Sequence, residues 1–300
     1  MSRLPGPSGP DWRDALEAVH SAKISQVRGV AGGDIGDSRR VEFESGEAVF
    51  LKLYPTPEPS DLDGNSGLGR AEANGLAWLA RTETLRVAQV IAWDEDWLAL
   101  EWIESARPAT DYDERLGVGL AELHRANPDR FGFAEGNWIG RLPQDNRAES
   151  SWAEFYRERR LRPLLDRARG NGALTSSLRA DFERLFTNLE FLVGPEEAPA
   201  RLHGDLWAGN VLPDESGQPC LIDPSVYGGH REMDLAMMRL FGGFSARVFE
   251  CYAATHPLAD GSDARIALYQ LYPLLVHVCL FGGSYVAQLE RSIEDALCAD

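Results

Sequence analysis

A polar loop between short strands carries the residue types best suited to chemistry. Residues 201–223 read RLHGDLWAGNVLPDESGQPCLID, which predicts a strand, a loop over 203–210 and a hairpin that ends on Asp223. Because the hairpin folds back, we expect Asp223 to lie beside Asn210 and close to Asp205. Asp205 could then accept a proton from an attacking hydroxyl, while Asn210 and Asp223 hold Mg²⁺ against nucleotide phosphates. Any one of these residues alone would more simply build a turn, but the three together favour phosphoryl transfer.

Lys52 is the second candidate for phosphate chemistry. The chain uses arginine almost throughout and has two lysines, Lys23 and Lys52. Lys52 lies in the apolar run AVFLKLY, so a buried ammonium group there needs an anionic partner. We expect Glu72, in the next predicted helix, to be that partner, although Glu42 or Glu44 could serve. A strand lysine paired with a helix glutamate is how kinases hold the α- and β-phosphates of ATP.

Two further segments could contact a nucleotide. Gly32, Gly33 and Asp34 begin a glycine-rich loop, GGDIG, between the first two predicted strands. Its backbone N–H groups could cover phosphates, although an ordinary hairpin turn would have the same composition. Glu101, Trp102 and Ile103 end the strand-rich part of the chain, where backbone groups would bind adenine in a two-lobed kinase.

The elements needed to position these residues fall into two groups. Period-two patterns predict strands, and helical periodicity predicts two early helices and most of the later chain. The first group begins with a helix over 12–21 that Asp11 could cap, and its other strands and helix cover 27–30, 40–44, 48–54, 70–81, 89–93 and 97–103. The predicted helices of the second group cover 109–126, 151–169, 174–193 and parts of 231–290, with the strand–loop–hairpin unit at 200–223. The pattern therefore predicts an α+β fold with an N-lobe of antiparallel sheet plus helix (1–103), a mainly helical C-lobe (104–300) and a cleft between them.

Composition excludes several classes of function. The net charge of −17 argues against a general binder of nucleic acid or anionic membrane, so local positive groups would have to hold phosphate. The four cysteines form no metal-ligand or CxxC spacing, and the first residues do not resemble a signal peptide, so we expect a cytoplasmic protein. The apolar stretch 266–281 is short for a membrane span and predicts a buried helix.

The order H-x-D-x-x-x-x-N followed by a strand-ending Asp resembles the catalytic loop and metal-binding Asp of protein kinases. Gly204 stands where those enzymes have Arg, and Asp223-Pro224-Ser225 replaces their DFG motif, which points to small-molecule relatives. The segments HGDLWAGN and LIDPSVYGGHREMDLAMMRLFGGF resemble the fructosamine kinase (ketosamine-3-kinase) family. FGFAEGNWIGRLPQDN, SWAEFYRERRL, GGDIGDS with FLKLY, and LYPLLVHVCLFGGSY are similar to the same family, so the resemblance covers nearly the whole chain.

The resemblance implies ATP-dependent phosphorylation of the C3 hydroxyl of a ketosamine, such as a fructosamine or ribulosamine. The 3-phosphate then falls apart and releases the free amine, which amounts to deglycation. The family pattern makes Asp205 the proton acceptor, gives Mg²⁺ to Asn210 and Asp223, pairs Lys52 with Glu72, and gives adenine to 101–103. Some members carry a redox-active cysteine in the glycine loop, but residues 31–40 contain none.

Two alternatives stay open at this stage. One is a related phosphotransferase for an aminoglycoside, choline or another sugar, and the other is a kinase-like binding module without activity.

Several polar or aromatic residues are candidates for substrate contact or for support of the loops. Trp207 could form the floor of a sugar site or belong to the core. The amides of Asn137, Gln144 and Asn146 suit sugar hydroxyls but are also common in loops.

Buried polar residues near the loop have structural alternatives. His203 more simply fixes the loop backbone than acts as an acid or base, and His277 is expected to be a core histidine. Asp234 is predicted to tie the segment after Asp223 to the catalytic loop, and Glu232 could do the same.

Overall fold

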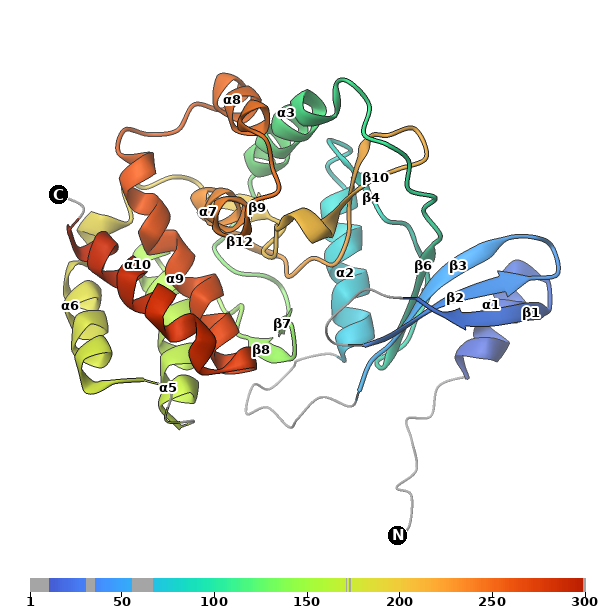
Figure 1. Cartoon of the computed structure of the whole chain (residues 1–300), viewed down its shortest axis with the longest axis horizontal. Coiled ribbons are helices and arrows are strands. Elements are labelled where there is room, and N and C mark those ends of the chain that lie inside the picture. Colours follow the sequence, from blue (N-terminus) through green and yellow to red (C-terminus); the bar gives the residue numbers. More distant parts are fainter. Residues whose placement is uncertain (1–10, 31–35, 56–66, 171, 173, 299–300) are drawn as a thin grey trace, which may run out of the picture.

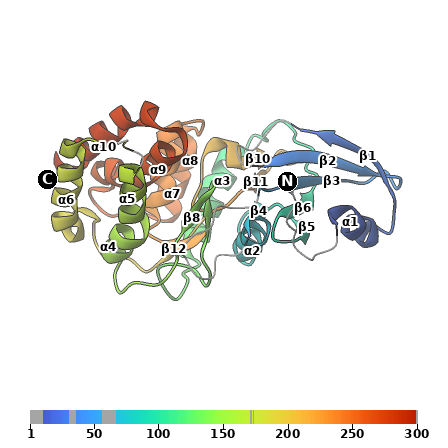
Figure 2. The same ribbon diagram turned by 90° about the horizontal axis from the view of Figure 1, so that it is seen from below.

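The computed structural model describes residues 11–298 except 31–35, 56–66, 171 and 173. The predicted phosphate-covering residues Gly32, Gly33 and Asp34 lie outside the described residues. Figures 1 and 2 show strands gathered at one end of the molecule and helices at the other, as the α+β prediction requires.

The strand-rich end is a 5-stranded antiparallel sheet in the order β1-β2-β3-β6-β5. Its strands are β1 (Ile24–Gly29), β2 (Asp37–Phe43), β3 (Ala48–Leu53), β6 (Trp97–Glu101) and β5 (Val90–Trp93). The helix α1 (Trp12–His20), whose N-terminus is capped by the Asp11 carboxylate, packs on one face. The helix α2 (Leu68–Ala80) packs on the other face, toward the rest of the molecule.

Strand alternation in β3 decides which way Lys52 points. Val49 and Leu51 are buried with Trp12 and Leu16 of α1. Because successive side chains of a strand face opposite ways, Lys52 must face the α2 side. This orientation places its ammonium group near Glu72. Glu42 of β2 lies opposite Ala48, four residues before Lys52, and pairs with Arg40 instead.

Helices build the other end around one large apolar core, which buries side chains from all of the long helices except α3 and α8. The helical elements are α3 (Tyr112–Arg125), α4 (Trp152–Phe155), the π-helical turn η1 (Tyr156–Leu161), α5 (Arg162–Gly170), α6 (Ser176–Leu192), α7 (Glu232–Phe241), α8 (Ala246–Thr255), α9 (Ser262–Phe281), the 3₁₀ turn η3 (Gly283–Tyr285) and α10 (Val286–Cys298). The helices α3 and α8 pack against each other over a second core that includes Leu116, Leu120 and Val248.

The helix α9 is long and apolar enough, by length and composition, to cross a membrane. In the structure 56% of its most apolar window is buried, and α9 packs between α7, α10 and α5. These contacts are those of a core helix, as the sequence predicted for 266–281.

Short strands join the two ends; the hairpin over 211–221 was predicted from the sequence, and the addition of a third strand to it was not. β9 (Ala200–Leu202) pairs with β12 (Tyr227–Gly229), and β10 (Val211–Pro213) pairs with β11 (Pro219–Leu221). β4 (Arg86–Val87) then adds in parallel to β11, so a segment before residue 103 joins the hairpin of the second lobe. The division into 1–103 and 104–300 therefore stays a proposal, because elements on the N-terminal side contribute to both parts.

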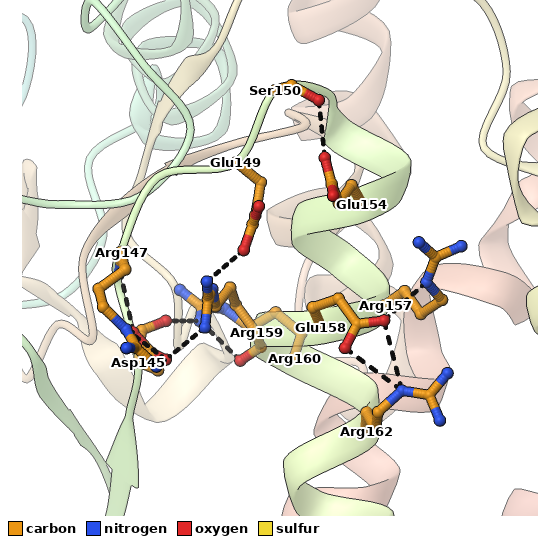
Figure 3. A network of polar contacts seen from close by, with 10 residues as sticks. All are labelled: Asp145, Arg147, Glu149, Ser150, Glu154, Arg157, Glu158, Arg159, Arg160 and Arg162. Carbon is orange, nitrogen blue, oxygen red and sulfur yellow. Dashed lines mark hydrogen bonds and ion pairs between the residues drawn. The ribbon is translucent and has the colours of Figure 1, made fainter.

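The predicted helix over 151–169 contains a π-helical turn instead of continuous α-helix. The turn carries a polar network that attaches it to the loop after the hairpin of β7 (Asn137–Ile139) and β8 (Leu142–Gln144) (Figure 3). The Asp145 carboxylate accepts hydrogen bonds from Arg147 at 2.7 Å and Arg159 at 2.9 Å. Arg160, which is completely buried, donates to the Asp145 carbonyl at 2.7 Å and to Asn146 Oδ1 at 2.6 Å. The hairpin is thereby fixed beside the cleft.

Candidate active site

The catalytic loop is held by a buried carboxylate. Asp234, near the start of α7, accepts hydrogen bonds from the backbone N–H groups of His203 at 2.8 Å and Gly204 at 2.9 Å. Gly204 has a φ of +83°, and a Cβ atom there would lie 2.0 Å from the Ser225 carbonyl oxygen. Only glycine fits this position, which explains why the arginine of protein kinases is absent. The predicted tie between Asp234 and the loops is present in the structure.

Glu232 does not share that role. Its carboxylate forms a buried ion pair with Arg265 of α9, at 2.7 and 2.9 Å. The prediction that Glu232 could tie the loops together was wrong, because α7 turns this side chain toward α9.

His203 fixes the loop and does not reach the open cleft. Its Nε2 lies 2.9 Å from the Ile222 carbonyl, which can only accept, so Nε2 carries the proton. Its Nδ1 accepts from the Asp205 N–H at 3.3 Å. Burial lowers the pKa of His203 below its usual value, which keeps the ring neutral. The structure thus supports the structural alternative for this residue.

The hairpin brings the three predicted polar groups together. Asn210 Nδ2 donates to Asp205 Oδ2 at 3.2 Å, to the Asp205 carbonyl at 2.8 Å and to the Asp223 carbonyl at 3.4 Å. The Ile222 N–H donates to the Asn210 carbonyl at 3.1 Å, which aligns the two arms of the hairpin. Asp223 has a φ of 54°, a left-handed conformation that is costly for a residue other than glycine. Such strain next to a cluster of polar groups is typical of a functional site.

Lys52 closes the group from the sheet side. Its Nζ lies 2.8 Å from Glu72 Oε1 and also donates to Asp223 Oδ1. Burial alone would lower the pKa of the Lys52 ammonium, but the charges of Glu72 and Asp223 outweigh it and raise the pKa above its usual value. For Glu72, burial raises the pKa, and the Lys52 charge opposes that change. The pair predicted from the sequence is therefore present, with Asp223 as an additional partner.

Lys52, Glu72, Asp205, Asn210 and Asp223 line one cleft of about 550 Å³ between the sheet and the hairpin. The apolar side chains of Phe50, Leu212 and Ile222 line the cleft, and Ile103 packs in the same cluster as Phe50 and Ile222. The combination of an apolar part and a charged part suits a nucleotide, whose base is flat and whose phosphates are anionic.

The side chains of the predicted adenine segment serve other purposes. Glu101 forms an ion pair with Arg86 at 2.7 Å and accepts from the Gln89 N–H at 2.9 Å. The Trp102 indole donates to Glu104 at 2.7 Å, and the Arg40 guanidinium lies over its ring. Adenine contact by the backbone of Glu101, Trp102 and Ile103 stays a prediction.

The predicted substrate amides form a buried network. Asn137 Oδ1 accepts from Gln144 at 2.7 Å and from Asn146 at 2.8 Å, and Asn137 Nδ2 donates to the Val226 carbonyl at 2.8 Å. Asn137 lines the cleft, but Gln144 and Asn146 are not among the described residues that do so. Substrate contact is therefore retained as a proposal for Asn137, whereas Gln144 and Asn146 lie behind it and orient it.

Trp207 is a surface residue of the cleft. Its side chain is 41% exposed and lines the cleft beside Asp205, so it does not belong to the core. A Cβ atom on Gly209 would lie 2.2 Å from the Trp207 ring, so Gly209 leaves room for the indole. This position suits the proposed contact with a sugar.

Two residues of the site were not predicted from the sequence. The Tyr54 hydroxyl donates to Glu72 Oε2 and so fixes the partner of Lys52. Tyr54 lies two positions after Lys52, and strand alternation could have placed both on one face. Arg86 joins Glu101 of the sheet to Asp214 of the hairpin at 2.8 Å, and no local pattern marks it.

The donor set fits a divalent metal held jointly by protein and nucleotide. Among the described residues, no three His, Cys, Asp or Glu side chains gather in a way that could hold a metal alone. The Asn210 amide nitrogen points to Asp205 and the backbone, which leaves its amide oxygen for a cation, beside the Asp223 carboxylate. Hard oxygen ligands of this kind, completed by phosphate oxygens, suit Mg²⁺ or a similar ion.

The sheet lobe and the helical lobe face one cleft, which is lined by Asp205, Asn210, Asp223 and Lys52. This arrangement defines a protein-kinase-like phosphotransferase. The chain belongs to the fructosamine kinase family, whose model matches residues 12–299. It is 39% identical to a probable ketoamine kinase from Thermus thermophilus (87% of this chain, 90% of that protein). It is 38% identical to mouse ketosamine-3-kinase (85% of this chain, 89% of that protein).

Solved structures agree with this assignment. The crystal structure of a putative fructosamine-3-kinase from Thermobifida fusca is similar with a TM-score of 0.86 and 42% identity, over 95% of this chain and 98% of that one. A choline kinase from Streptococcus pneumoniae shares the fold, with a TM-score of 0.62 at 15% identity over 95% and 96% of the two chains. The predicted two-lobed kinase-like fold and the predicted family are both confirmed.

Proposed function

We propose that this protein transfers the γ-phosphoryl group of ATP to the C3 hydroxyl of a ketosamine, a fructosamine or ribulosamine. One observation carries the proposal: Asp205, Asn210, Asp223 and Lys52 line one cleft, although Lys52 and Asp223 lie 171 residues apart in the chain. The names of the relatives support the acceptor class, since they include ketosamine-3-kinase and protein-ribulosamine 3-kinase.

We infer a task for each side chain from its place in the cleft. Lys52, fixed by Glu72 and Tyr54, is positioned to hold the α- and β-phosphates of ATP. Asn210 and Asp223 would hold Mg²⁺, which supplies positive charge against the phosphate oxygens when bound. Asp205, fixed through its backbone by His203 and through Oδ2 by Asn210, accepts the proton of the attacking hydroxyl.

The product explains the biological use of the reaction. A ketosamine can tautomerise to a C1–C2 enaminol, and in that form the phosphate on C3 is allylic and readily eliminated. Elimination breaks the C3–O bond, releases inorganic phosphate, and leaves an imine at C1, which water hydrolyses to the free amine. The reaction therefore supports removal of sugar from glycated amines.

A phosphate-transfer screen tests the proposal directly. The protein is incubated with ATP and Mg²⁺ and one acceptor at a time: a fructosamine, a ribulosamine, kanamycin or choline. We expect ADP release and a product heavier by one phosphoryl group, seen by mass spectrometry, with the ketosamines alone. Turnover with kanamycin or choline alone would replace the ketosamine assignment by a related phosphotransferase, and nucleotide binding without turnover would indicate a binding module.

A further inference from the structure

Arg86 is bound by acidic side chains from both ends of the molecule. Its Nη2 atom donates to Glu101 of β6 at 2.7 Å. Its Nη1 atom donates to Asp214 and Glu215, in the turn between β10 and β11, at 2.8 Å each. A guanidinium group is planar and always charged, so it donates in two fixed directions at once. One side chain therefore joins the five-stranded sheet to the hairpin of β10 and β11.

Both sides of this connection are themselves held in place. The Asp214 carboxylate also accepts from two backbone N–H groups of its own turn, at 2.8 and 2.9 Å, and the residue is 6% exposed. Glu101 Oε1 accepts from the Gln89 N–H at 2.9 Å. The backbone of Arg86 is fixed as well, because β4 pairs with β11. Ion pairs between flexible surface side chains contribute little, but here the charged groups are restrained on every side.

The chain that follows the predicted adenine segment, 101–103, also stays against the hairpin. The Ala106 N–H donates to the Asp214 carbonyl at 3.2 Å, and the Ala109 N–H donates to the Gly217 carbonyl at 2.9 Å. Gly217 has a φ of +75°, and a Cβ atom there would lie 2.5 Å from a carbonyl oxygen of this same stretch of chain. The adenine segment is therefore tied to the hairpin turn at its start and beyond its end.

The open end of the same hairpin carries the two predicted metal ligands. Asn210 immediately precedes β10, and Asp223 follows shortly after β11. β10 and β11 pair over three residues, so at about 3.3 Å per residue the turn lies roughly 10 Å from this end. A ladder this short transmits the position of its turn to its open end. Arg86 therefore lies where the adenine segment and the metal ligands are placed relative to each other.

We propose that Arg86 is a positioning residue for ATP, which fixes the adenine segment 101–103 relative to the metal ligands Asn210 and Asp223. The proposal rests on the proposed kinase function, in which ATP is the phosphate donor. Adenine and the triphosphate are two ends of one ligand, so each end assists the binding of the other only when the two subsites keep a matching separation. Without Arg86 each subsite still binds its own end of ATP, but the joint binding of both ends becomes weaker.

Three ligands distinguish the two subsites from their joint use. Adenosine occupies the adenine end, tripolyphosphate with Mg²⁺ occupies the phosphate end, and ATP with Mg²⁺ occupies both. Each ligand is titrated into the full-length protein by calorimetry, at a temperature where circular dichroism shows that the variant is folded. In Arg86→Met we expect ATP to bind at least about tenfold more weakly, while adenosine and tripolyphosphate bind within about twofold of wild type.

Arg86→Lys separates positioning from stability. Lysine keeps a positive charge among the three carboxylates, so the melting temperature should stay close to that of wild type. Its single ammonium group cannot reproduce the fork of donors, so ATP should bind about threefold to tenfold more weakly while the affinities for the two fragments stay unchanged. Arg247→Met is the matched control, because Arg247 of α8 pairs with Glu114 of α3 at 3.0 Å and does not line the cleft. This control should keep all three affinities.

The affinities decide between a positioning role and a purely structural one. An equal loss for ATP and adenosine, or for ATP and tripolyphosphate, overturns the proposal, because Arg86 would then serve one subsite alone. An unchanged ATP affinity in Arg86→Met overturns it as well, even if the variant is less stable. A wild-type protein that does not bind ATP refutes both this proposal and the proposed function. A wild-type protein that binds ATP but does not phosphorylate a fructosamine refutes the proposed function alone, since the three affinities still test Arg86.

Discussion

Replacing Lys52 by methionine removes the only positive charge that the structure places between Glu72 and Asp223 in the described part of the cleft. The two carboxylates then lie roughly 5 Å apart, and at an effective dielectric constant of about 20 their repulsion amounts to about 3 kcal/mol. Asp223 is partly exposed, which screens the repulsion, so we expect the free energy of unfolding to fall by about 2 kcal/mol at pH 7.

The pH dependence of this loss has a defined sign. Burial already raises the pKa of Glu72, and removal of Lys52 takes away the charge that opposes the rise. In the variant, the folded state therefore binds a proton at a pH where the unfolded state has lost it. The loss in unfolding free energy should be largest at pH 8 and should shrink as the pH falls toward 5.

Turnover and stability should respond differently to a second change. In Lys52→Met we expect kcat/KM for ATP to fall at least about a hundredfold, because the α- and β-phosphates lose their cation. In Lys52→Met/Glu72→Gln the repulsion is gone, so urea unfolding should recover most of the lost stability while turnover stays low. The reasoning is refuted if Lys52→Met keeps kcat/KM within threefold of wild type, or if the double variant is no more stable than the single one.

Three further predictions concern the catalytic loop at Gly204, the buried side chain of His230 and the divalent metal ion. Gly204→Ala should lower the melting temperature and should lower the turnover by more than about tenfold, because the new Cβ would displace the Ser225 carbonyl. Gly46 is the control, since it has a similar φ of +88° but open space around it. Gly46→Ala should lose about 1 kcal/mol of stability and keep its turnover. Burial lowers the pKa of His230 to about 4, from an unfolded value near 6.5, so the unfolded state binds the proton first as the pH falls. The protein should therefore lose up to about 3 kcal/mol of unfolding free energy between pH 6.5 and pH 4. Urea titrations at several pH values should show a smaller loss in His230→Gln than in wild type, and an equal loss in both would contradict this origin. Removal of divalent ions with a chelator should abolish phosphate transfer, and added Mg²⁺ should restore it, whereas transfer in the chelator alone would show that Asn210 and Asp223 do not hold a required ion.

The parts of the site that were predicted correctly come from local patterns. The segment 200–223 is short, so strand alternation and turn composition are enough to bring Asp223 back to Asn210. The pairing of Lys52 with Glu72 followed from one buried charge in an apolar strand and one acidic residue in the next helix. Both inferences needed only the periodicity of a strand and the cost of an unpaired buried charge.

The parts that were missed depend on contacts between distant segments. Nothing in the local sequence of Arg86 and Val87 indicates that this segment pairs in parallel with β11, because two residues carry no periodic pattern. The roles of Gln144 and Asn146 depend on whether a loop faces solvent or folds back on itself, and their composition is the same in both cases. Glu232 was misassigned for a related reason, since its partner Arg265 lies 33 residues further along the chain.

Single-turnover phosphate transfer by Asp205→Asn tests most directly the claim that Asp205 receives the hydroxyl proton in a nucleotide cleft. Asparagine keeps the size and the hydrogen bonds of this position but cannot accept a proton. We predict that the variant binds ATP within about threefold of the wild-type affinity and that its rate of transfer to a fructosamine falls by about a thousandfold. A variant that transfers phosphate at nearly the wild-type rate would contradict the account.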